Sequence, residues 1–154
     1  MKRDFGTAAI GGGIGGLLDA VYATLLWGVY FGMGTPRLWQ SVAAGLLGRE
    51  AAFAGGGASA LLGLALHFFI AFGMALVYVR ASRRLPVLTA RPWLMGALYG
   101  FVLYLVMNFV VVPLSAIGWR GPPTPMGALQ ALIPHVIFVG PAIALAAARR
   151  ARTG

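Results

Sequence analysis

Cysteine is absent from this chain, and only three of its 154 residues are acidic. Without cysteine there are no disulfides, thiolate metal sites or cysteine nucleophiles. Charged residues make up 10% of the chain, whereas soluble domains contain about 25%. The hydrophobic fraction is 60%, well above the usual share. Water is therefore not the main solvent that this composition favours.

What the chain does contain is four long apolar stretches, over residues 8–31, 57–79, 93–116 and 127–148. Each reaches the length of about 20 residues that a helix needs to cross about 30 Å of hydrocarbon. Lipid offers the backbone no hydrogen-bond partners, so a spanning segment must be helical. The sequence predicts an all-α polytopic membrane protein, with four transmembrane helices in one transmembrane domain over residues 1–154.

The link between the first and second spans predicts a short amphipathic helix over residues 36–48. Pro36 suits the first turn of a helix. Five apolar residues then fall on one side, and Arg37, Gln40 and Ser41 on another; the apolar ones are Leu38, Trp39, Val42, Leu46 and Leu47. Such a helix can lie in the outer membrane interface or pack on the bundle as a cap, and we expect the cap.

The twelve Lys and Arg residues divide unevenly between the two predicted sides of the membrane. The side with both termini holds nine of them: Lys2, Arg3, Arg80, Arg83, Arg84, Arg91, Arg149, Arg150 and Arg152. The other side holds Arg37, Arg49 and Arg120. The positive-inside rule places both termini in the cytoplasm. Because these cations flank apolar segments, they indicate topology, and we expect no nucleic-acid partner.

Each span carries one strongly polar residue near its middle: Asp19, His67, Asn108 and His135. A polar side chain in hydrocarbon is costly, and the predicted depths of the four agree within about 6 Å. We expect them to form one internal cluster, connected directly or through water. It is the only candidate for chemistry in this sequence.

Small residues recur at every fourth position along the spans, and this spacing predicts close packing between helices. Among them are Gly12, Gly16, Gly63, Gly96 and Gly100. Helices in lipid associate through close backbone approach, which glycine permits.

Two prolines interrupt the fourth span. Pro134 and Pro141 each remove one backbone hydrogen bond, which makes them candidate hinges beside His135. Membrane helices contain proline routinely, so a purely structural explanation is the simpler one.

Three stretches resemble a group of small, uncharacterised four-helix bacterial inner-membrane proteins. They are residues 40–48 (QSVAAGLLG), 61–67 (LLGLALH) and 107–116 (MNFVVVPLSA), and the resemblance runs from about residue 12 to 144. It implies a four-helix bacterial membrane protein and supplies no activity.

The polar cluster leaves several functions open. The first is structural: interhelical hydrogen bonds contribute about 0.6 kcal/mol each and hold an accessory membrane subunit in register. The second is a proton-coupled or small-solute transport module that uses Asp19 and His67. The third is haem ligation by His67 and His135, with a two-histidine metal site including Asp19 as a variant.

We expect the structural role. The sequence predicts no catalytic residue, no enzyme activity, no resident metal and no cofactor. The expected partners are the lipid bilayer and either another membrane protein or a second copy of this chain.

Overall fold

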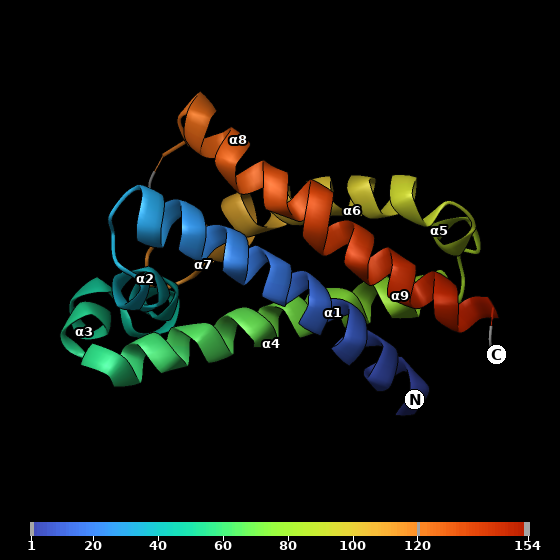
Figure 1. The fold of residues 1–154 in the computed structure, drawn as a ribbon, viewed down its shortest axis with the longest axis horizontal. Helices are drawn as coiled ribbons and strands as arrows, with labels where there is room; N and C mark the ends of the chain where they lie inside the picture. Colours follow the sequence, from blue (N-terminus) through green and yellow to red (C-terminus); the bar gives the residue numbers. More distant parts are fainter. Residues whose placement is uncertain (1, 120, 153–154) are drawn as a thin grey trace. The chain divides into compact units, whose positions relative to one another are not determined.

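The computed structural model describes residues 2–119 and 121–152, and in these it is all-helical, with no strand (Figure 1). The elements with their bounds are α1 (Lys2–Ala23), the π-helical segment η1 (Thr24–Tyr30), α2 (Thr35–Leu47), α3 (Arg49–Ala54), α4 (Gly56–Ser82), α5 (Val87–Ala90), α6 (Pro92–Val106), η2 (Met107–Val111), α7 (Val112–Leu114), α8 (Pro125–Pro134), η3 (His135–Val139) and α9 (Gly140–Arg152). Arg120, which the charge count includes, lies outside the described residues.

Four continuous helical stretches are long and apolar enough to cross a membrane: 2–30, 56–82, 92–114 and 125–152. The all-α class and the number of such helices are therefore confirmed, while the bounds differ from the predicted ones. Three of the four stretches are longer than predicted. Charged side chains stabilise these longer ends by interacting with the helix dipoles: Asp4 lies in the first turn of α1, and Arg80 lies in the last turn of α4. The third stretch ends at Leu114 rather than at residue 116, because Ser115 is already extended.

The chain divides into two compact units. Unit 1 comprises residues 1–19, 68–104 and 124–154, and unit 2 comprises residues 20–67 and 105–123. Each is described by itself below.

The core of unit 1 is built from alanines, larger aliphatic residues and Tyr78, and the partly buried Tyr99 packs against it. The Tyr78 hydroxyl donates to the Leu88 carbonyl and the Tyr99 hydroxyl to the Met74 carbonyl, both at 2.8 Å. Each bond joins two helices through an aromatic side chain whose polar end would otherwise be buried without a partner. The buried members of this core are Ala8, Ala75, Tyr78, Val79, Leu103, Val139, Ile143, Ala144 and Ala147.

In unit 2, α2 packs against the first part of α4. Two glycines with positive φ, Gly34 (84°) and Gly48 (78°), flank α2 and turn the chain at its two ends. Gln40 is buried, and its side-chain amide donates to the Gly56 carbonyl at 2.9 Å. The Ser59 hydroxyl, also buried, lies 2.6 Å from the Ala52 carbonyl.

The predicted apolar face of α2 was partly wrong. Leu38 and Trp39 are buried as expected, but Gln40 lies on the buried side, and Leu46 and Leu47 are exposed. Gln40 is buried because the turn before α4 offers it a carbonyl partner, which a pattern of apolar positions does not reveal. The helix bounds, Thr35–Leu47, are within one residue of the predicted 36–48.

Candidate functional site

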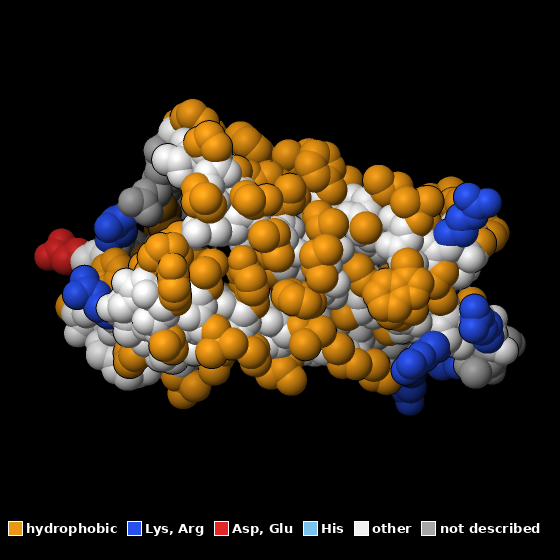
Figure 2. Space-filling model, turned by 45° about the horizontal axis from the view of Figure 1, so that its top comes forward, with side chains coloured by type: hydrophobic (Ala, Val, Ile, Leu, Met, Phe, Trp, Pro, Cys, Tyr) orange, Lys and Arg blue, Asp and Glu red, His pale blue; other side chains and the backbone are white. Residues whose placement is uncertain are grey.

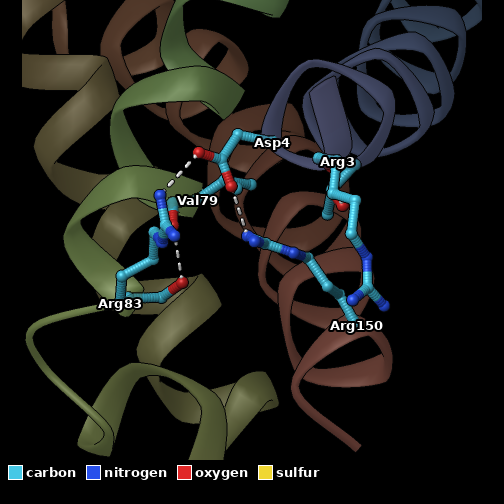
Figure 3. Close-up of polar contacts among 7 residues, drawn as sticks. Arg3, Asp4, Val79, Arg83 and Arg150 are labelled. Atoms are coloured by element: carbon cyan, nitrogen blue, oxygen red, sulfur yellow. Dashed lines mark hydrogen bonds and ion pairs between the residues drawn. The ribbon is translucent and has the colours of Figure 1, made fainter. Parts of the chain in front are cut away.

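The most completely buried charged side chain in the described residues is Asp4, in the first turn of α1. It is 2% exposed and forms two ion pairs (Figure 3). One carboxylate oxygen lies 3.0 Å from an Arg83 nitrogen, and the other lies 2.7 Å from an Arg150 nitrogen. The second contact is the closer of the two ion pairs. We call Asp4, Arg83 and Arg150 the Asp4 triad.

The Asp4 triad joins three parts of unit 1 at their ends. Asp4 lies in the first turn of α1, Arg83 follows the end of α4, and Arg150 lies in the last turn of α9. The arginine side chains are 56% and 22% exposed, respectively, so Arg150 is the more enclosed partner. A carboxylate near a helix N-terminus and a cation near a C-terminus both interact favourably with the helix dipoles.

The sequence interpretation missed this site because it looked for polar residues in the middle of apolar spans. Asp4 precedes the predicted first span and lies among arginines, where a solvated charge is the simplest expectation. One signal could have found it: Asp4 is the only acidic residue at the end where nine cations were predicted to gather. A lone carboxylate in such a setting will attract more than one of them.

The four predicted cluster residues are all half-buried, and they fall into the two units in pairs. Asp19 and His135 belong to unit 1, whereas His67 and Asn108 belong to unit 2. The four-residue cluster therefore stays a prediction. Among the described residues, no group of three or more His, Asp or Glu is arranged to hold a metal ion.

Each histidine has a defined neighbour within its own unit. The His67 ring lies edge-on to the Trp39 ring, with centroids 5.4 Å apart. His135 Nδ1 lies 2.8 Å from the Ala131 carbonyl oxygen one turn earlier. A carbonyl can only accept, so Nδ1 carries the hydrogen in this contact. The Tyr104 ring meets the His135 ring edge-on at 6.5 Å.

Asn108 and His135 both lie in π-helical segments, and a proline follows each segment. Pro113 and Pro141 lack the N–H groups that would bond the carbonyls of Phe109 and Ile137, which are inside η2 and η3. The released carbonyls explain why the helix widens at these positions. The predicted hinge residue Pro134 ends α8, directly before η3.

The five glycines predicted to pack all lie against another segment of their own unit. A Cβ added at Gly12 would come within 2.8 Å of the Ala71 carbonyl, and one at Gly16 within 3.1 Å of the Ala71 side chain. At Gly96 it would come within 2.7 Å of Pro141, and at Gly100 it would overlap the His135 carbonyl. At Gly63 it would overlap the Trp39 carbonyl.

The described residues thus define an all-helical protein with four helices long enough to span a membrane. A buried aspartate forms ion pairs that join the ends of three helices in unit 1. Comparisons of the chain with protein-family models, with curated proteins and with solved structures found no match. The resemblance to small four-helix inner-membrane proteins stays a prediction.

Proposed function

We propose that this chain is an integral protein of the bacterial inner membrane that serves as a structural or accessory subunit of a membrane assembly. The observation that carries the proposal is the outward direction of its apolar side chains. Only 17% of the most apolar window of α4 is buried, and the same holds for the stretch 92–114. Soluble monomers rarely expose apolar surface on this scale, so lipid or a membrane partner must cover it.

The distribution of side chains supports insertion across the membrane. On the face shown in Figure 2, apolar side chains cover the bodies of the helices, and Lys and Arg lie at helix ends. All nine cations predicted to be cytoplasmic belong to unit 1, whereas Arg37 and Arg49 belong to unit 2. This pattern favours cytoplasmic termini by the positive-inside rule.

The absence of cysteine makes the orientation directly testable. We expect Glu50→Cys, in α3, to react with a membrane-impermeant maleimide on intact spheroplasts. We expect Arg91→Cys to react only after the membrane is permeabilised. Both positions are exposed, so the membrane alone should decide access. Labelling of Arg91→Cys but not Glu50→Cys on intact spheroplasts would reverse the topology, and labelling of both would contradict a membrane-spanning arrangement.

An accessory subunit must also bind a partner protein. Extraction in a mild detergent at native expression should yield a complex containing another membrane protein in a fixed molar ratio. A single species of one chain or a homo-oligomer, active in transport after reconstitution, would contradict the accessory role.

The second candidate function is proton-coupled or small-solute transport, with Asp19 as the residue that binds the proton. The π-helical segments at Asn108 and His135 favour it, because such segments occur frequently at functional sites. In liposomes under a pH gradient, the parent protein should then carry protons, Asp19→Asn should abolish the flux, and Glu50→Gln should preserve it. Equal flux for Asp19→Asn and the parent would exclude this role for Asp19. The haem hypothesis predicts a visible absorption band, and no observation in either unit adds to it.

A further inference from the structure

A groove of about 580 Å³ lies between α1 and α9 in unit 1. Arginines line one end of it, namely Arg3, Arg149 and Arg150. Apart from Gly6 and Thr7, the rest of the lining is apolar, including Ile10, Ile14 and Leu145. Along α1 the lining residues run from Arg3 to Ile14, which corresponds to about 16 Å of helix. This is roughly half of a hydrocarbon layer about 30 Å thick, or one leaflet.

Glycines give the groove its shape. A Cβ added at Gly11 would lie 3.1 Å from the Ile143 Cα, and one at Gly15 would lie 3.1 Å from the Val139 Cα. α1 is therefore nearly in backbone contact with α9 at Gly11 and with the end of η3 at Gly15, so the segments on the two sides of the groove are held close together. At Gly6, near the arginines, an added Cβ would meet nothing within 4 Å, so the groove is open there.

Three of the described residues that line the groove are arginines, and none of the lining residues is acidic. Unit 1 contains nine Lys and Arg residues and two acidic residues, Asp4 and Asp19. Arg150 contacts the Asp4 carboxylate on one side and lines the groove on the other. In Figure 3 the Arg3 side chain extends beside Arg150 and not toward Asp4. An anion at this end would therefore meet a large excess of positive charge.

We propose that this groove binds one anionic phospholipid of the inner leaflet, such as phosphatidylglycerol. Its phosphate would lie at Arg3, Arg149 and Arg150, and one acyl chain would lie along Ile10, Ile14 and Leu145. Basic pockets between transmembrane helices are known lipid headgroup sites, and the apolar length of this one selects a lipid over a free anion. The inference rests on the proposed membrane location and adds a specific ligand to it.

The test is native mass spectrometry of the full chain in detergent, titrated with phosphatidylglycerol or with phosphatidylcholine. We expect the first phosphatidylglycerol to bind about tenfold more tightly than phosphatidylcholine. Arg149→Gln should weaken it about fivefold, while Arg91→Gln, which alters an exposed arginine outside the groove, should not. Equal binding of the two lipids, or equal effects of the two substitutions, would overturn the proposal.

A second pair of variants tests the groove itself. Gly6→Trp should fill its open end and remove the first lipid site. Gly13→Trp is the matched control, because Gly13 lies on the same helix, has nothing within 4 Å of an added Cβ and does not line the groove. Loss of the site in both variants, or in neither, would contradict the assignment.

Three further outcomes distinguish lipid binding from binding of a free anion, and failure of this inference from failure of the proposed function. If millimolar inorganic phosphate displaces the lipid completely, the site recognises a free anion and the lipid assignment fails. If cysteine labelling shows that the chain does not span the membrane, the proposed function and this inference fail together. If labelling shows a spanning protein that binds both lipids equally, only this inference fails.

Discussion

Asp4→Asn should lower the stability of this protein by about 3 kcal/mol, although Asn has nearly the same shape as Asp. The substitution removes the carboxylate charge while Arg83 and Arg150 stay in place. Removing one partner of a buried ion pair leaves an uncompensated charge, which typically costs about 3–5 kcal/mol. We take the low end because Arg83 is 56% exposed and can reach water. The measurement is the melting temperature of the purified protein in detergent.

The chain provides its own control for this experiment. Glu50→Gln makes the same chemical change at an exposed acid in α3, and we expect its free energy of unfolding to stay within about 0.5 kcal/mol of the parent value. If Asp4→Asn were no more damaging than Glu50→Gln, the Asp4 triad would contribute nothing to stability.

A double substitution separates an unpaired cation from a simple loss of packing. Asp4→Leu should destabilise strongly, because Arg150 is only 22% exposed and would lose its partner. Asp4→Leu with Arg150→Met should be closer to the parent, since replacing a whole buried pair by apolar side chains is often neutral. Additive losses in the double variant would contradict this explanation.

Gly63→Ala should destabilise the protein by about 3 kcal/mol, although it adds only one methyl group. The new Cβ would overlap the Trp39 carbonyl and come within 3.0 Å of the Ala43 nitrogen. Both are backbone atoms of α2, so no side-chain rotation relieves the overlap, and α2 must move away from α4. That movement would uncover Trp39, which is now 8% exposed and lies against the His67 ring.

The matched control is Gly73→Ala in the same helix, where an added Cβ meets nothing within 4 Å. Alanine is the better helix former by about 0.5–1 kcal/mol, so this variant should be as stable as the parent or more so. The measurement is the melting temperature of each variant and of the parent protein in the same detergent. Equal stability of Gly63→Ala and Gly73→Ala would mean that α2 and α4 are not held in close backbone contact.

The sequence allowed α2 to be predicted within one residue, but not the whole of its buried face. Its ends follow from local chemistry, with a proline in the first turn and glycines at φ values that other residues rarely adopt. Gln40 was assigned to the polar side because side-chain type alone suggests exposure. Its burial depends on the Gly56 carbonyl, sixteen residues away in the chain.

The candidate site shows the same limit more sharply. No residue within a few positions of Asp4 in the sequence indicates that this carboxylate is buried. Its partners Arg83 and Arg150 are 79 and 146 positions further along, and only the packing of α1, α4 and α9 brings them to one carboxylate.

What the sequence by itself determined is the helical class and the four stretches able to span a membrane, because these depend on the length and apolarity of continuous segments. It also indicated which glycines allow close approach, since a missing side chain is visible in the sequence. The tertiary structure decided which charges meet, which polar residue of α2 is buried and where an arginine-lined groove forms. Those features depend on contacts between segments distant in the chain, for which local composition carries no signal.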